Sequence, residues 1–127
     1  MAEVVLDSSV LLAAIRGEIR IDNLLPILEG AVVSAVNWCE IHTKLHDSEL
    51  TQTERTYEIL ALLDRVEPFT SSRAKLAAEL RQQTRRAGLS LGDRACLALG
   101  IELEADVYTS DRAWQTVDVP CRIHLIR

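Results

Sequence analysis

The sequence has few aromatic side chains: tryptophan, tyrosine and phenylalanine together make up 4% of its 127 residues. Apolar residues still account for 48%, so a core has to be built mainly from Leu, Ile, Val and Ala. A chain of this length buries enough surface to be stable without disulfides or a structural metal. We therefore expect one ordinary domain over residues 1–127.

Cysteine is also scarce, and Cys39, Cys96 and Cys121 are too widely spaced for a CxxC pair. An odd number of isolated cysteines excludes a disulfide scaffold and indicates reduced thiols. We expect no signal peptide, because no basic segment followed by an apolar stretch is visible at the N-terminus. No apolar run approaches the roughly 18–20 residues that cross a bilayer. We expect a cytoplasmic protein that does not contact a membrane.

A basic excess is absent as well: 14 Lys and Arg face 19 Asp and Glu, which gives a net charge of −5. Most nucleic-acid binders need Lys and Arg for phosphate contacts, so the total argues against that class. Net charge is a sum, however. If the acids gather in one pocket with bases around it, an acidic protein can still engage RNA, and the charge leaves this question open.

Short apolar segments alternate with helical patterns along the whole chain. The pattern predicts strands over residues 3–6, 31–34, 66–69, 105–109 and 121–126. It predicts helices over residues 8–15, 21–28, 35–46, 51–63, 71–86 and 91–103. Thr51 and Glu54 have the spacing of a capping box, and Pro68 favours an edge strand. This alternation predicts a three-layer α/β/α fold with a central, mainly parallel sheet.

Four acidic residues fall where this pattern places strand ends or helix starts: Asp7, Glu40, Asp93 and Asp111. Each has an ordinary explanation taken singly. Asp7 and Asp111 fit strand ends or helix caps, Asp93 fits a capping box with Ser90, and Glu40 fits a solvated helix face. Ligands of open α/β sheets bind at the carboxyl ends of the strands. Taken together, the four carboxylates predict an acidic pocket at that edge.

Four carboxylates in one pocket repel each other, and a hard divalent cation relieves the repulsion. Mg²⁺ and Mn²⁺ prefer oxygen ligands, and such a site suits phosphodiester hydrolysis. We expect Ser8 or Ser9 to cap the helix that follows the first strand, so that Asp7 is not needed as a cap.

Four segments in this order resemble the PIN domain family and, within it, the VapC-type toxin ribonucleases of bacterial toxin–antitoxin pairs. They are VVLDSS (4–9), SAVNWCE (34–40), LSLGDRACLALG (89–100) and ADVYTSDRAW (105–114). Each segment alone is a weak signal, whereas all four at this spacing are specific. The resemblance spans the chain from Val4 to the last predicted strand.

The resemblance implies a parallel sheet flanked by helices, usually in a homodimer, and metal-dependent endonucleolytic cleavage of RNA, commonly tRNA or rRNA. It implies a VapB-type antitoxin partner whose C-terminal segment occupies the acidic groove. The implied acidic quartet, which holds Mg²⁺ or Mn²⁺, is Asp7, Glu40, Asp93 and Asp111. The implied supporting residues are Ser9, Asn37 and Thr109.

Four arginines are candidates for RNA contacts. Arg94 and Arg112 each directly follow a quartet acid, and either fits a phosphate contact or a pair with a carboxylate. Arg85 and Arg86 end the basic helix predicted over residues 71–86, where a solvated face with cations near its C-terminus is the alternative.

Two other functions remain to be compared, namely a PIN domain that processes or binds RNA outside a toxin–antitoxin pair and a metal-dependent phosphatase on an α/β fold. A phosphatase of the haloacid-dehalogenase type wants a second Asp where this chain has Ser9. Cys39, His42 and His46 lie within a narrow helical stripe, which suits zinc, but no fourth ligand is apparent.

Overall fold

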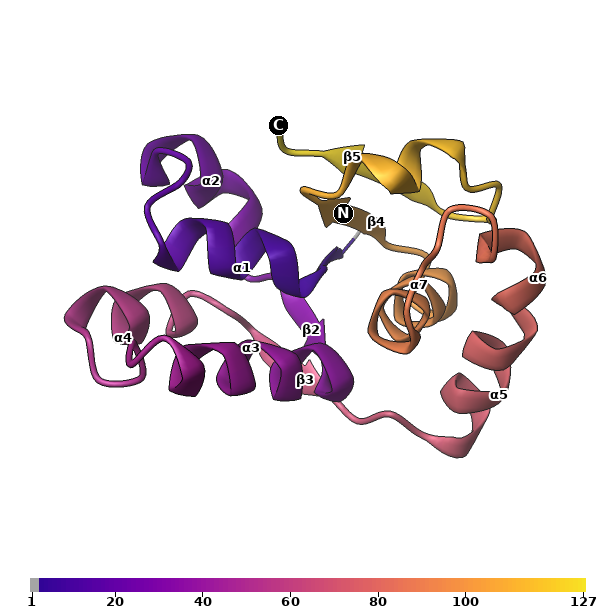
Figure 1. Ribbon diagram of the computed structural model, residues 1–127, viewed down its shortest axis with the longest axis horizontal. Helices are drawn as coiled ribbons and strands as arrows, with labels where there is room; N and C mark the ends of the chain where they lie inside the picture. Colours follow the sequence, from indigo (N-terminus) through magenta and orange to yellow (C-terminus); the bar gives the residue numbers. More distant parts are fainter. Residues whose placement is uncertain (1–2) are drawn as a thin grey trace.

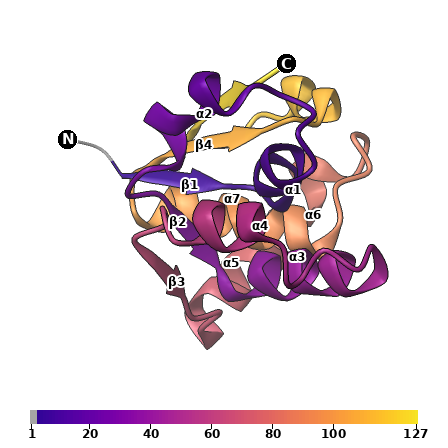
Figure 2. The ribbon, with the colours of Figure 1, turned by 90° about the vertical axis from the view of Figure 1, so that its left-hand side faces the viewer.

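A computed structural model describes residues 3–127. Its centre is a five-stranded sheet in the order β3-β2-β1-β4-β5, and every strand pair is parallel. The strands are β1 Val4–Leu6, β2 Val32–Ser34, β3 Arg65–Glu67, β4 Asp106–Thr109 and β5 Arg122–Leu125. Figure 2 shows β4, β1, β2 and β3 in succession across the sheet. The predicted parallel α/β fold is confirmed.

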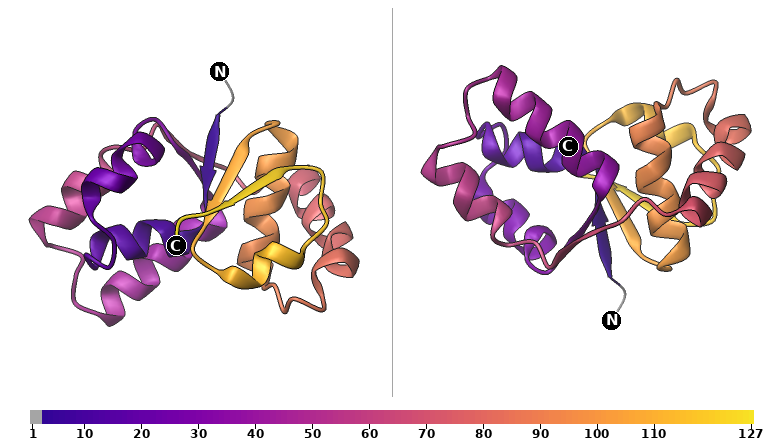
Figure 3. Two further views of the ribbon diagram at one scale, coloured as in Figure 1. Left: turned by 90° about the horizontal axis from the view of Figure 1, so that it is seen from above. Right: turned by 90° about the horizontal axis from the view of Figure 1, so that it is seen from below.

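Helices cover both faces of the sheet, as Figures 1 and 3 show. One face carries α1 Ser8–Ile15, α2 Ile21–Leu28, α3 Ala35–Asp47 and α4 Glu54–Leu60. The other carries α5 Ser71–Glu79, α6 Arg81–Thr84 and α7 Leu91–Glu102. A short 3-10 helix, η1 Arg112–Thr116, follows β4. Within residues 3–127, no helix has the length and apolar character needed to cross a membrane.

The sheet separates two apolar cores, because successive side chains of a strand point to opposite faces. Leu6 and Val33 pack with the helices α1 to α4, whereas Val5 and Val107 pack with α5 and α7. Both cores are largely aliphatic, as the scarcity of aromatic residues predicts. Trp114 of η1 is the exception and the largest fully buried side chain.

The strand order places a topological switch point next to β1. The chain passes from β1 to β2 and β3 on one side, then returns to the other side of β1 with β4 and β5. The connections that follow β1 and β4 therefore leave in opposite directions. In open α/β sheets, the crevice at the carboxyl ends of two such strands is where ligands bind.

Three predicted elements differ from the structure. The helix predicted over residues 51–63 is wrong at both ends: α4 starts at Glu54, and Thr53, not Thr51, caps it by accepting a hydrogen bond from the Thr56 N–H. Thr53 is the cap because the segment before it forms a turn. The Thr53 N–H and the Thr56 hydroxyl both donate to the carbonyl of Leu50, so residues 50–53 do not join the helix.

The single helix predicted over residues 71–86 is two helices, because the backbone departs from helical geometry at Leu80, where ψ is −8°. The hydroxyl of Thr84 donates to the Leu80 carbonyl, a contact that bends helices. The predicted strand over residues 66–69 is shifted to β3, which ends before Pro68 because proline has no N–H to donate. β3 is an edge strand, as expected.

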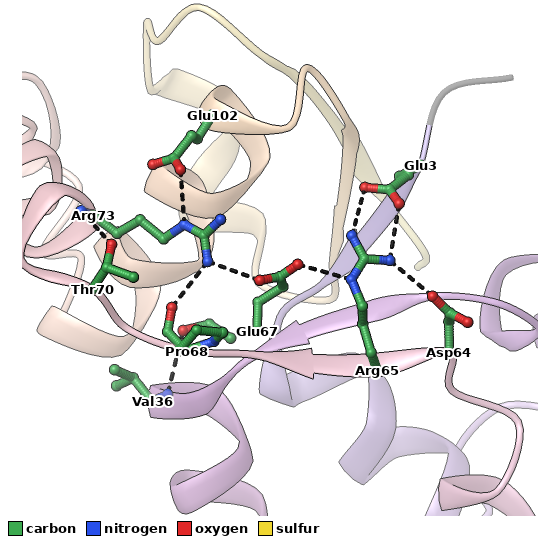
Figure 4. A network of polar contacts seen from close by, with 10 residues as sticks. Glu3, Val36, Asp64, Arg65, Glu67, Pro68, Thr70, Arg73 and Glu102 are labelled. Carbon is green, nitrogen blue, oxygen red and sulfur yellow. Dashed lines mark hydrogen bonds and ion pairs between the residues drawn. The ribbon is translucent and has the colours of Figure 1, made fainter.

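A network of ion pairs connects the edge strand β3 to Glu3, which directly precedes β1, and to the helices α5 and α7 (Figure 4). Arg65 donates to Glu3 at 3.1 Å and to Glu67 at 2.8 Å. Glu67 also accepts from Arg73 at 3.0 Å, and Arg73 reaches Glu102 of α7 at 3.1 Å. The two guanidinium groups, Arg65 first, hold the pKa of Glu67 below its usual value. This network fixes α5 and α7 against the sheet.

Candidate metal centre

Asp7 lies at the switch point, between the carboxyl ends of β1 and β4. Its backbone N–H donates to the carbonyl of Tyr108 at 3.0 Å, which extends the β1–β4 pairing up to the acid. Its side chain is only 3% exposed. The prediction that Ser8 or Ser9 caps α1 is wrong: Asp7 occupies the cap position without a side-chain capping bond, and the Ser9 hydroxyl instead donates to the Asp7 carboxylate.

The two oxygens of the Asp7 carboxylate have different environments. Oδ2 accepts hydrogen bonds from Ser9 at 2.7 Å and from Thr109 at 3.0 Å. Oδ1 is buried and has no hydrogen-bond partner among residues 3–127. The pKa of Asp7 is raised to about 6, chiefly by burial; the charges of Asp93 and Glu40 contribute to the rise, and the hydroxyl contacts from Ser9 and Thr109 oppose it.

Ser9 and Thr109 also organise the loop after β4. The Ser9 hydroxyl accepts from the N–H of Ser110 at 3.0 Å, and the Thr109 hydroxyl accepts from the N–H of Asp111 at 3.1 Å. The two hydroxyls therefore join Asp7 to the segment that carries Asp111. Both residues were predicted to support the acids, and the structure brings them beside Asp7.

Glu40, in the second turn of α3, accepts hydrogen bonds from its own helix and from α1. Its Oε1 accepts from the Asn37 amide at 3.0 Å and from the Ser8 hydroxyl at 3.3 Å. The same amide nitrogen donates to the carbonyl of Gly92 in α7 at 3.1 Å. Asn37 is fully buried, so it works as a fixed bridge between α3 and α7.

Asp93 and Asp111 cap helices as well as facing the other acids. Asp93 forms a complete capping box with Ser90, and Asp111 accepts from the N–H of Ala113 at 2.9 Å. The ordinary explanation for these two residues is thus correct, and each commits one carboxylate oxygen to a cap. Burial raises the pKa of Asp93, and the charges of Glu40 and Asp111 add to that shift.

The four acids therefore come from four distant segments and lie close enough to perturb one another. As they stand, no three Asp, Glu, His or Cys side chains in the described chain are grouped tightly enough to hold a metal ion. Two observations nevertheless suit a hard cation: the buried, unpartnered Oδ1 of Asp7 and an all-oxygen donor set. The residues present thus fit Mg²⁺ or Mn²⁺.

Comparison with known proteins decides the family. The sequence matches the PIN domain family over residues 4–120. The chain belongs to the PIN domain family. A search of curated proteins finds no match.

Solved structures resemble this PIN domain over nearly its whole length. VapBC2 from Rickettsia felis bound to a promoter DNA fragment has a TM-score of 0.70 at 16% identity, covering 96% of this chain and 97% of that one. DNA-bound VapBC from Salmonella typhimurium has a TM-score of 0.67 at 17% identity, covering 98% of each. VapBC-5 from Mycobacterium tuberculosis has a TM-score of 0.61 at 21% identity, covering 100% and 99%. At these identities the likeness shows the fold.

The four candidate arginines of the PIN domain differ in their surroundings. Arg94 donates to the Ala77 carbonyl of α5 at 3.1 Å, so its guanidinium is engaged with a neighbouring helix. Arg85, Arg86 and Arg112 are exposed, and none forms an ion pair with a described residue. These three side chains are thus available to a ligand.

The residues considered for zinc do not share one environment. Cys39 and His46 are exposed, whereas His42 is half-buried and packs edge-on against Trp38 with ring centroids 4.4 Å apart.

Sequence reasoning missed two residues of the PIN domain that touch Glu40, namely Ser8 and Gly92. A glycine in the first turn of a predicted helix was the only available signal for Gly92, since it lowers helix stability.

Proposed function

We propose that this PIN domain is a Mg²⁺- or Mn²⁺-dependent endoribonuclease and the toxin of a toxin–antitoxin pair. PIN domains are generally nucleases, which supports a hydrolase acting on phosphodiester bonds. The observation that carries the metal dependence is the buried, unpartnered Oδ1 of Asp7 beside three other carboxylates. Burying an unpaired carboxylate is costly, and a cation at this point removes the cost.

The acids divide into two roles in this proposal. Asp7, Asp93 and Asp111 hold the ion, which supplies Lewis-acid stabilisation of the charge on the phosphate. Ser9 and Thr109 keep the Asp7 carboxylate in one orientation by donating to Oδ2, so that Oδ1 would be left to bind the ion. Such fixed supporting contacts are a general requirement of metal sites.

Glu40 holds the ion as well or acts on the attacking water. Its Oε1 is fixed by Asn37 and Ser8, whereas Oε2 makes no hydrogen bond to a described residue. In the second of these roles, Oε2 is the atom that accepts a proton as the water oxygen bonds to phosphorus. The bond from phosphorus to the 3′ oxygen breaks in line, and the leaving oxygen takes a proton from solvent water, which leaves 5′-phosphate and 3′-hydroxyl ends. No covalent intermediate with the protein forms.

The partners follow from the fold neighbours and the exposed bases. VapBC toxin–antitoxin proteins share this fold, which supports a VapB-type antitoxin that covers the acidic groove. We propose a cytoplasmic homodimer whose substrate is a structured RNA such as tRNA or rRNA. Arg85, Arg86 and Arg112 bind its phosphates, because exposed guanidinium groups without carboxylate partners are suited to that contact.

An RNA cleavage assay tests the proposal. The wild type, Asp7→Asn and the exposed-acid control Asp118→Asn are incubated with total tRNA and rRNA, with Mg²⁺ and with chelator. We expect cleavage by the wild type and the control in Mg²⁺ only, and at least about 10²-fold slower cleavage by Asp7→Asn. RNA binding without cleavage would favour a binding-only PIN domain, and cleavage that persists in chelator would refute metal dependence.

Toxicity is tested separately from chemistry. Expression of the wild type should arrest growth of a bacterial host, and co-expression of its VapB-type antitoxin should restore growth. A metal-dependent nuclease that leaves growth unchanged would instead be a PIN domain that processes RNA outside a toxin–antitoxin pair.

A further inference from the structure

Gly92 occupies a position where glycine is unfavourable for the helix alone. It is the second residue of α7, it is buried, and its backbone does not adopt the positive φ that calls for glycine. Glycine within a helix costs roughly 0.5–1 kcal/mol relative to alanine. A packing reason for the missing side chain is therefore expected.

The reason is the Glu40 carboxylate, which fills the space where a Cβ would stand. A Cβ built on Gly92 would lie 2.5 Å from Oε1 of Glu40, 2.6 Å from its Cδ and closer still to Oε2. These separations are far below van der Waals contact, so any side chain at this position moves the carboxylate. The Glu40 carboxylate therefore lies directly against Gly92 in the first turn of α7, and Gly92 immediately precedes Asp93.

Two hydrogen bonds hold the carboxylate in this space, and a third fixes the amide that donates one of them. Asn37 binds Glu40 and the Gly92 carbonyl with one amide nitrogen, and Ser8 adds a hydrogen bond from α1. The backbone of Gly92 thus forms one wall of the Glu40 site and also anchors the amide that orients Glu40. Displacing the carboxylate lengthens these bonds beyond their usual range and weakens them.

We propose that Gly92 is a positioning residue, whose missing side chain lets Glu40 join the acidic cluster; this rests on the proposed metal-dependent function. The group that must yield to a Cβ is the end of a flexible side chain, not backbone. Alanine at this position therefore leaves the fold intact and turns Glu40 away from Asp7 and Asp93. Metal binding weakens although no ligand has been replaced.

The test measures Mn²⁺ binding by calorimetry on the purified full chain. Gly92→Ala should weaken binding by about tenfold or more, the range found for residues that orient metal ligands. The matched control is Gly100→Ala in the same helix, where a Cβ would collide with Cγ2 of Val107 in the apolar core. That variant should lower the melting temperature and leave Mn²⁺ affinity within about twofold.

Melting temperatures without metal separate positioning from a purely structural role. With Glu40→Ala the obstacle is gone, so adding Gly92→Ala should raise the melting temperature by about 2–4 °C, as helix propensity dictates. With Glu40 present the same change should give no rise. If Gly92→Ala alone does not fold, recovery of folded protein in the double variant supports the proposal, and failure of both overturns it.

The outcomes distinguish the two proposals. Wild-type affinity for Mn²⁺ in Gly92→Ala, or the same change in melting temperature in both backgrounds, would overturn the positioning role and leave the proposed nuclease standing. No Mn²⁺ binding by the wild type would overturn both.

Discussion

Neutralising Asp7 should stabilise the metal-free protein, although it removes the most buried acid of the site. In the folded state burial raises the pKa of Asp7 from 3.8 to about 6. At pH 7.5 the ionised carboxylate therefore costs the fold about 3 kcal/mol, taking about 1.4 kcal/mol per unit. Asparagine removes that charge and keeps an oxygen to accept from Ser9 and Thr109.

Part of this gain is lost again, because the asparagine amide occupies the place of Oδ1, where no partner is available. An unsatisfied buried donor costs about 1–3 kcal/mol. The net expectation for Asp7→Asn at pH 7.5 in chelator is a gain of up to about 2 kcal/mol, or up to about 8 °C in melting temperature for a chain of this size.

The pH dependence follows from the direction of the shift. A raised pKa means that the folded state holds its proton more tightly, so the contribution of Asp7 to stability is complete below pH 4. It is lost as the pH rises through about 6. The advantage of Asp7→Asn should therefore be small at pH 4 and large at pH 7.5.

Thermal unfolding at both pH values, with chelator and with saturating Mn²⁺, checks this. Mn²⁺ should stabilise the wild type and not Asp7→Asn, whereas the exposed-acid control Asp118→Asn should behave as the wild type in every condition. A variant less stable than the wild type at pH 7.5 in chelator would refute the electrostatic reasoning. So would a difference that does not depend on pH.

Two further predictions concern the ion-pair network and the RNA surface. Arg73→Ala should lower the free energy of unfolding by about 2–3 kcal/mol in urea at pH 7, against about 1 kcal/mol or less for the more exposed Arg65→Ala. Because the pKa of Glu67 is lowered, the part of the Arg73 contribution that comes from Glu67 should be present at pH 7 and be lost as the pH falls through that lowered pKa; equal losses at pH 7 and in acid would contradict it. Arg112→Ala should weaken RNA binding in fluorescence anisotropy and reduce the salt slope by about 1, and an unchanged slope would remove Arg112 from the interface.

Much of the fold was predictable because its local signals are strong. The helices over residues 8–15 and 21–28 match their predicted bounds, since Gly17 and Gly30 follow them closely and adopt positive φ. All five strands were predicted to within one or two residues at their ends. Clean breaks and continuous apolar runs leave few alternatives for a segment.

The helix at residue 51 was misplaced because two threonines compete to cap it. Thr51 has the capping-box spacing with Glu54, but the choice of Thr53 depends on hydroxyl contacts with the Leu50 carbonyl. The break at Leu80 likewise involves a hydroxyl, that of Thr84, which donates to the Leu80 carbonyl. Local hydrogen bonds from threonine hydroxyls to backbone carbonyls compete with helix geometry, and residue spacing alone does not tell which of them forms.

The candidate acids were identifiable because they follow predicted strands or start predicted helices. The hydrogen-bond partners and burial of each acid were not predictable from the sequence. The unpartnered oxygen of Asp7 depends on hydroxyls that approach from residues 9 and 109. The bridge from Asn37 to Gly92 spans 55 residues of sequence. Spacing along the chain indicates which side chains share an edge of the sheet, and only packing determines which atoms meet.

The most direct test of the central claim is the location of a bound ion. Crystals grown with Mn²⁺ and measured at the manganese absorption edge should give one or two anomalous peaks beside Oδ1 of Asp7, within ligand distance of at least one more of the four acids. Asp7→Asn crystals should lack the peak. A wild-type crystal with no peak at Asp7, or with manganese only at other surface acids, would contradict the account.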